Sequence, residues 1–420
     1  MQRLFLLMNN QELIPNLFKT EFRKITSVLC RHFGIEHIEV AEDIASETFL
    51  AAMEIWPYKG IPQNPTAWLY SVAKNKTLNY IKRNYLFATK IKSELKNDAK
   101  TARKYEIDLS DKNITDSQLQ MLFAICHPSI PVEAQIALAL RVLCGFGIDE
   151  IANAFLTNKE VVNKRLFRAK EKLRQEKVKI EFSQEAEINK RLETVLTTLY
   201  LLYNEGYYSE SENSIVRKDL CLEAMRLCKM LIENADTNKP EVNALLSLMC
   251  FHASRFEARR DEKGEMILYE DQDTSLWNKD LISKGKYFLN CSATGANISK
   301  YHFEAAIAYW HTKKADTKEK WQNILQLYNQ LLILEYSPVA ALNRTYALSK
   351  VKGKKEAIAE AEKLQIEDNH FYHSLLGELY TNLDNIKAKE CFKKALALSK
   401  TQPEQHNIQK KIDKLDTVTL

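Results

Sequence analysis

Long segments of the chain place apolar residues at steps of three and four, which is the period of a helix with one buried face. Residues that break helices are scarce, since the 420 residues include only 10 glycines and 9 prolines. Strands and tight turns need such residues at their corners, so this scarcity argues against a sheet-rich fold. We therefore expect an all-α chain, and its length predicts two or three domains.

The cysteines and the N-terminus indicate where such a chain works. The 8 cysteines are scattered and none forms a CxxC pair, which predicts reduced, partly buried thiols rather than a disulfide framework. The apolar run 4–8 is shorter than a signal peptide requires, and no window is long enough to span a membrane. We expect a cytoplasmic protein.

No residues are spaced as a nucleophile with its base or as a metal site, so we expect no enzyme activity, cofactor or metal.

The segment 159–174, KEVVNKRLFRAKEKLR, has the highest density of positive charge. It carries seven basic and two acidic residues, a net charge of +5, which equals the formal net charge of the whole chain. Four apolar residues follow steps of four, three and four and predict a buried face: Val162, Leu166, Ala169 and Leu173. The segment is therefore predicted to be a basic amphipathic helix.

A short helix and a tight turn are predicted just before it, so residues 148–174 have the pattern of a helix-turn-helix, with Asn158 capping the second helix. Such a helix fits the major groove, where Asn and Arg read base edges and Lys holds phosphates. The alternative is an ordinary surface helix of a bundle. The residues predicted to bind DNA are Lys159, Asn163, Lys164, Arg165 and Arg168.

Two motifs precede this pattern. AEDIASETFLAAMEIW, residues 41–56, lies in a segment that has six acidic residues and no Lys or Arg between positions 36 and 54. NPTAWLYSVAKNKTLNYIKR, residues 64–83, begins with Asn64 and Pro65, which favour the start of a helix. The two motifs, followed by the helix-turn-helix, resemble an ECF (extracytoplasmic function) sigma factor of bacterial RNA polymerase over residues 12–176.

The resemblance implies a role for each motif. Residues 159–168 would read the distal promoter element. The first motif would bind core RNA polymerase, through Asp43, Glu47, Thr48, Phe49 and Trp56. The second would contact promoter DNA at the upstream melting element, through Trp68, Tyr70, Asn75, Lys76, Asn79, Lys82 and Arg83.

The chain departs from the family pattern at two positions. Leu156 stands where the turn of the helix-turn-helix usually has glycine, which predicts a reshaped turn. Lys82 replaces the more usual arginine, so the charge is kept but forked hydrogen bonding is lost.

The resemblance and the helical period together predict the domains. Residues 1–84 would form a sigma region-2-like domain and 114–178 a region-4-like domain. Between them, 85–113 would be a linker within a basic stretch, since positions 74 to 104 have ten basic and two acidic residues. The remainder, 182–420, would be a helical extension.

The extension contains two similar stretches, 338–364 and 373–399, whose spacing resembles tetratricopeptide (TPR) units. The whole chain resembles a subgroup of ECF sigma factors with such an extension. Repeat surfaces usually hold proteins, so we expect a protein partner or a contact within the chain. A fragment ended near residue 180 is expected to keep DNA binding.

Two other functions fit parts of the sequence. The first is a stand-alone DNA-binding regulator with a TPR-type sensor, which would not need the motifs of residues 36–83. The second is a TPR scaffold whose basic helix is incidental. Transcription started by core polymerase with the purified chain would separate the three functions.

Overall fold

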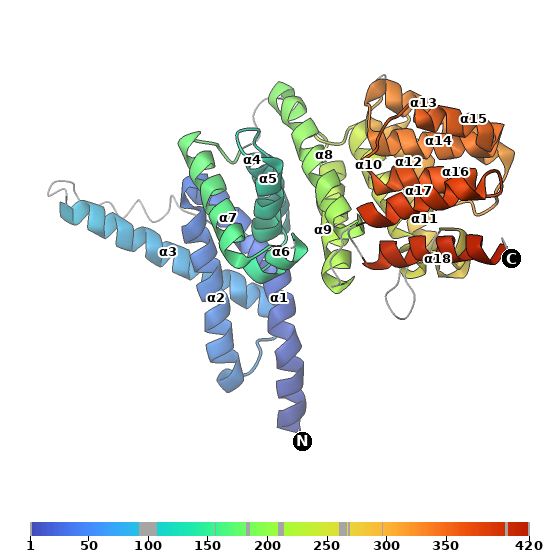
Figure 1. The fold of residues 1–420 in the computed structure, drawn as a ribbon. Coiled ribbons are helices and arrows are strands. Elements are labelled where there is room, and N and C mark those ends of the chain that lie inside the picture. The colour runs from blue at the N-terminus through green and yellow to red at the C-terminus, as the bar shows by residue number, and fades with distance from the viewer. Residues whose placement is uncertain are drawn as a thin grey trace. The chain divides into compact units, whose positions relative to one another are not determined.

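The computed structural model describes residues 2–91, 107–155, 157–181, 185–208, 214–259, 267, 269–295, 297–399 and 402–418. Within these segments the chain forms 18 α-helices and no strand, so the all-α prediction is confirmed (Figure 1). Leu156, the expected unusual turn residue, and most of the expected linker lie outside the described residues.

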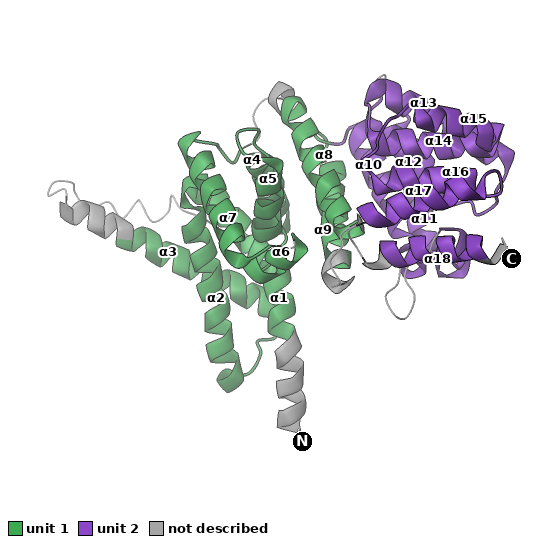
Figure 2. Cartoon of the chain, in the orientation of Figure 1, with its two compact units in different colours: residues 1–237 green, residues 238–420 purple. Residues whose placement is uncertain are grey.

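The helices divide into two compact units, residues 1–237 and 238–420 (Figure 2). The sequence placed the start of the C-terminal extension at residue 182, which differs from this division. The helices α8 (Glu185–Tyr208) and α9 (Ser214–Glu233) belong to the first unit. They do so because their apolar faces are buried in it: α8 contacts α4 and α5, while α9 contacts α4 and α6.

The first unit has the following other elements in chain order: α1 (Gln2–Phe33), η1 (Ile35–His37), α2 (Ile38–Lys59), α3 (Pro65–Ile91), α4 (Asp111–Ile125), α5 (Val132–Leu138), the π turn η3 (Ala139–Leu143), α6 (Ile148–Ala154) and α7 (Lys159–Gln175). Helix α3 continues through 85–91, which the sequence assigned to the linker. It continues because no Gly or Pro follows Pro65 before Ile91. Helix α4 begins at Asp111, before residue 114, where the second domain was expected to start.

Helix α1 is the centre of the first unit. Its buried side chains Phe22, Ile25 and Leu29 have no exposed surface. It contacts α2 and α3 of the expected first domain and also α4 and η3 of the expected second domain. The two expected domains therefore share one core rather than forming separate ones.

The second unit is a succession of helices, each packed against the next in the chain. They are α10 (Pro240–Ala253), α11 (Lys279–Ser292), α12 (Lys300–His311), α13 (Lys318–Leu334), α14 (Pro338–Lys352), α15 (Lys354–Glu362), α16 (His370–Tyr380), α17 (Asn385–Leu398) and α18 (Gln402–Val418). The two repeats expected from the sequence fall on the pairs α14–α15 and α16–α17.

Two glycines of the second unit allow close packing between paired helices. A Cβ atom at Gly285 would lie 2.6 Å from the ring of Phe251, and one at Gly377 would lie 2.6 Å from the ring of Phe392. Such distances are shorter than van der Waals contact, so each glycine is needed for its helix pair to approach as it does.

Other expectations can be compared with the described segments. All 8 cysteines lie in them; none is in a disulfide, and six are buried. No described helix has the length and apolarity to cross a membrane.

Helix α9 is fastened to the first unit by charged groups with little access to solvent. The Arg23 guanidinium on α1 lies 2.7 Å from the Glu223 carboxylate, and their side chains are 11% and 19% exposed. Arg226 donates to Glu223 at 2.7 Å and to the carbonyl oxygen of Leu143 in η3, also at 2.7 Å. Glu223 thus joins α9 to α1, and Arg226 joins α9 to η3.

We predict that Glu223→Gln destabilises the first unit by about 3 kcal/mol, because Arg23 and Arg226 would keep their charges without the carboxylate that compensates them. Urea unfolding followed by circular dichroism measures the change. The control is Glu233→Gln on the same helix, where the exposed pair with Lys229 at 3.2 Å should contribute less than about 1 kcal/mol. Equal losses in the two variants would contradict the prediction.

Candidate nucleic-acid and polymerase interface

Helix α7 begins where the sequence predicted. The Asn158 side chain accepts a hydrogen bond from the backbone N–H of Val161 at 2.9 Å and so caps the helix. The predicted apolar face is confirmed, because the buried residues of the helix are Val162, Leu166, Ala169 and Leu173. Burial of that face turns the N-terminal part of the opposite face toward solvent.

Most of the predicted DNA-binding residues of α7 lie on this exposed face. Asn163, Lys164 and Arg168 are exposed. Lys159 is also exposed, and its amine forms an ion pair with Asp149 of α6 at 2.6 Å, which raises the pKa of Lys159. Arg165 is half-buried, with its guanidinium 5.4 Å from the centre of the Phe155 ring. The structure therefore separates Arg165 from the four more accessible residues.

One side of the C-terminal half of α7 lies against η1, and two of its basic side chains reach acidic residues of α2, which runs beside α7 in Figure 1. The Lys170 amine lies 2.5 Å from the Glu42 carboxylate, and Arg174 lies 2.9 Å from Glu39. These contacts join residues more than 120 positions apart in the chain, so no local pattern in the sequence indicated them. Two of the seven basic residues of α7 are thereby paired with acidic residues of the predicted polymerase-binding segment.

The residues predicted to bind polymerase on α2 divide into exposed and buried ones. Asp43 and Glu47 are exposed, whereas Thr48, Phe49 and Trp56 are buried. The sequence-based assignment of these last three as contact residues needs correction, because their side chains form the core of the unit. Such residues hold α2 in place rather than meeting a partner.

Particular contacts explain this burial. The Thr48 hydroxyl donates to the carbonyl oxygen of Ile44 at 2.8 Å. The Phe49 ring packs edge-on against Phe18 of α1, with centroids 5.0 Å apart, and the Trp56 ring packs edge-on against Trp68 of α3 at 5.4 Å. The buried stripe of α2 also uses small residues, Ala41, Ala45 and Ala52. Met53, which is 56% exposed, lies outside this stripe.

The apolar residues Leu50, Met53 and Tyr58 are exposed on α2 and were absent from the predicted contacts. Thr48, Ala52 and Trp56 define the buried side of α2. The helical positions of Leu50, Met53 and Tyr58 relative to that side are the signal for their exposure. Exposed acidic and apolar side chains therefore share the open surface of α2.

Helix α3 presents a row of polar residues to solvent. Its first turn is capped by Asn64, whose side chain accepts from the backbone N–H of Ala67 at 3.0 Å. Four of the seven predicted DNA-binding residues are exposed: Asn75, Asn79, Lys82 and Arg83. Their spacing of four, three and one places them along one side of the helix.

The other three predicted residues of α3 are half-buried and are engaged in the fold. Trp68 packs on Trp56, and the Lys76 amine lies 2.9 Å from the Glu47 carboxylate of α2. The Tyr70 hydroxyl donates to Glu21 at 2.6 Å. Burial is the larger cause and this hydrogen bond the smaller cause of a raised pKa of Tyr70, so the hydroxyl remains protonated. These contacts fix the direction of α3 and hence of its exposed row.

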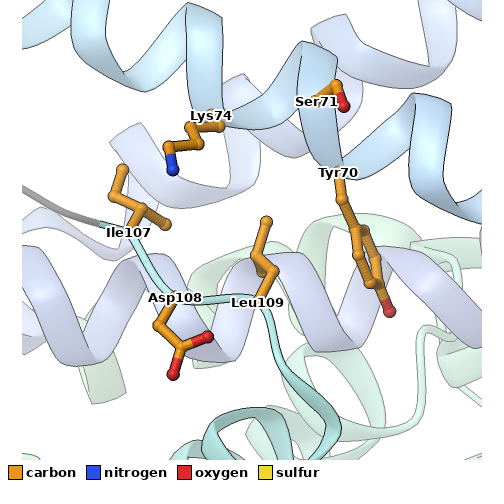
Figure 3. Close-up of a pocket in the computed structure, with 6 residues that line it drawn as sticks. All are labelled: Tyr70, Ser71, Lys74, Ile107, Asp108 and Leu109. Carbon is orange, nitrogen blue, oxygen red and sulfur yellow. The ribbon is translucent and has the colours of Figure 1, made fainter.

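A hollow of about 590 Å³ lies beside α3. Tyr70, Ser71 and Lys74 line it from the helix, and residues 107–109 line it from the opposite side (Figure 3). Ser71 is four positions before Asn75, so the hollow borders the exposed row. No pattern in the sequence indicated this hollow, since its second wall comes from the far end of the expected linker.

The described residues place no group of three or more His, Cys, Asp or Glu side chains where they would hold a metal ion. The contacts described on α2, α3 and α7 are ion pairs, hydrogen bonds and aromatic contacts, which are the interactions used to bind proteins and nucleic acids.

Comparison with known protein families identifies the part of the chain that carries α2 and α3. Residues 17–86 match the model of sigma-70 region 2, which covers much of α1, all of α2 and most of α3. Residues 191–293 match DUF6596, a family of unknown function. No solved structure matches the chain.

A relative extends the similarity to nearly the whole chain. It is described as "Uncharacterized protein R00370" of Rhizobium meliloti (strain 1021), is 32% identical over 395 residues, and the match covers 92% of each chain. The region 2 domain supports a sigma-factor role, with binding of RNA polymerase and recognition of promoter DNA. The chain thus belongs to the same family as this Rhizobium meliloti protein, and its N-terminal part is a sigma-70 region 2 domain.

Proposed function

We propose that the protein is an alternative sigma factor of the ECF type, which binds core RNA polymerase in the bacterial cytoplasm and directs it to promoters. The observation that carries the proposal is the sigma-70 region 2 match on α1–α3, whose exposed residues include acids on α2 and a polar row on α3. A stand-alone regulator would have no use for that domain. The chain would act without enzyme activity or a cofactor of its own.

In this proposal each exposed surface has one task. Asp43 and Glu47 of α2 would dock on polymerase, with the exposed apolar residues beside them. The row Asn75, Asn79, Lys82 and Arg83 of α3 would hold the upstream melting element through hydrogen bonds and phosphate contacts. Trp68 and Tyr70 would orient α3 from the protein side.

The pair α6–α7 would act as a helix-turn-helix that reads the distal promoter element. The exposed face of α7 supports this assignment, because Asn163 and Arg168 are suited to base edges and Lys164 to phosphate. Arg165 would support the helix through Phe155 rather than reach DNA.

The second unit, residues 238–420, would be a TPR-like repeat domain that works on protein. Its helices pack successively in the manner of repeat proteins, in which each unit contacts its neighbours. Either the extension captures a protein partner, or it acts on the first unit of its own chain.

We expect Asp43→Lys combined with Glu47→Gln to lower both the association with core polymerase and the yield of run-off transcription. The lysine reverses an exposed charge, whereas the glutamine still accepts a hydrogen bond from Lys76 and spares the fold. Glu193→Lys, an exposed charge reversal on α8, is the control. Full transcription by a folded Asp43/Glu47 variant would reject this docking surface, and no transcription by the unaltered chain would reject the sigma-factor role.

We expect Arg168→Ala to weaken promoter binding by about 1–3 kcal/mol and Lys164→Ala to weaken it less, since phosphate contacts are worth less than base contacts. Fluorescence anisotropy at several salt concentrations measures both the affinity and its salt slope. Lys172→Ala is the control on the same helix, because Lys172 pairs with Glu176 one turn away at 2.8 Å. Unchanged affinity and slope in an Arg168/Lys164 double variant would disprove DNA reading by α7.

We expect removal of residues 238–420 to change transcript yield while leaving DNA binding intact, because unit 1 retains its own core. The shortened chain should end after Thr237 and not near 180, since a cut at 180 removes α8 and α9 and exposes the apolar faces they cover. Run-off transcription with both chains at equal concentration, with and without cell extract, measures the effect. Equal yields in both conditions would show that the extension has no regulatory role.

A further inference from the structure

Large apolar side chains of the second unit are open to solvent where α13 ends and α14 begins. Four of them lie between positions 333 and 339, and a fifth lies just before α12. We call these residues the apolar edge, and their exposed fractions are Ile298 58%, Ile333 79%, Leu334 51%, Tyr336 64% and Val339 55%. Single exposed apolar residues are ordinary, but a group of this size in one place marks a contact with another protein.

An ion pair joins the two segments that form the apolar edge. The Lys300 amine, in the first turn of α12, lies 3.0 Å from the carboxylate of Glu335, which stands between Leu334 and Tyr336 in the chain. Helix α12 packs on α13, and α13 packs on α14 (Figure 1). These contacts bring Ile298 to the α13–α14 corner, so the edge is one surface rather than two.

The core of the second unit does not use the apolar edge. Other side chains fill the space between α12, α13 and α14, among them Ile324 and Leu331 of α13 and Ala347 of α14. Ile333 comes nine residues after Ile324, which is about two and a half helical turns, so it lies on the opposite side of α13. The edge is therefore apolar surface that the fold of a single chain leaves in water, where it is unfavourable.

The charges beside the apolar edge favour a second copy of this chain as its occupant. The edge carries one base and one acid, Lys300 and Glu335, whose side chains are 24% and 55% exposed. A two-fold axis brings the same patch of two copies together, so a patch with both signs sets the base of one copy against the acid of the other. A patch of this kind is complementary to itself and has no net charge to select an acidic or a basic partner.

The area of the apolar edge also suits a contact between two copies. Five side chains of this size and exposure offer on the order of 600 Å² per copy, so a two-fold contact would bury about 1,200 Å², the lower end of the range for stable interfaces. The expected dimer is therefore a reversible one.

We infer that the apolar edge is a dimer interface, on which a second copy of the chain docks about a two-fold axis. Ile333 and Tyr336, the most exposed members, supply most of the apolar contact. The dimer joins two first units, so one assembly presents two region 2 domains. This inference concerns the second unit alone, and its test does not depend on the proposed sigma-factor function.

The first test adds charge to the apolar edge in the full-length chain. The variant combines Ile333→Asp with Tyr336→Asp, which are exposed enough for the fold to survive, as circular dichroism would verify. The matched control combines Leu383→Asp with Ile386→Asp, two apolar residues at the α16–α17 turn that are 48% and 77% exposed. Light scattering after gel filtration, at concentrations up to roughly 100 μM, measures the molar mass.

The unaltered chain and the control should approach twice the mass of one chain, which is 48.7 kDa. The Ile333/Tyr336 variant should keep the mass of one chain, with a dissociation constant raised at least roughly 10-fold. An unaltered chain that keeps the mass of one chain at every concentration overturns the inference. A folded Ile333/Tyr336 variant that dimerises as the unaltered chain does also overturns it.

The second test asks whether Lys300 and Glu335 act between copies. Lys300→Glu places two acids at the edge and Glu335→Lys places two bases there, so each variant alone should dimerise less than the unaltered chain. An equal mixture of the two variants sets acids against bases and should regain the dimer mass. Mixing cannot repair a pair that acts only within one chain, so a mixture that stays at the mass of one chain overturns the two-fold contact.

Discussion

Burial of helix α1 is the constraint on which the first unit depends. Phe22, Ile25 and Leu29 have no exposed surface, and the helices packed on them come from both expected sigma-type domains. Because one helix supplies the core of both, α2 and α3 belong to the same compact unit as α4–α7. The α8–α9 hairpin adds a second tie, through Glu223 and its two arginines.

This shared core gives α7 two unlike halves. Toward its N-terminus the apolar face is buried and Asn163, Lys164 and Arg168 remain open to solvent. Toward its C-terminus Lys170 and Arg174 meet Glu42 and Glu39. The positive charge that suggested DNA binding is therefore only partly available in this arrangement, and the rest serves a contact within the chain.

The helices and many of their faces could be predicted from the sequence. The four buried residues of α7 and the caps at Asn64 and Asn158 follow from local period and local hydrogen bonding. The site was predicted less completely. Thr48, Phe49 and Trp56 belong to a family motif, yet they are buried, because a motif conveys which residues occur together and not whether each serves the core or the surface.

The sequence by itself determined the all-α class, the starts of α3 and α7 and the charge of each helix, because these depend on residues within one or two turns of each other. Only the tertiary structure decided that α8 and α9 belong with the first unit and that Lys170 meets Glu42, 128 positions away. The physical reason is that an amphipathic face specifies that it must be covered, while the packing of all the helices selects what covers it.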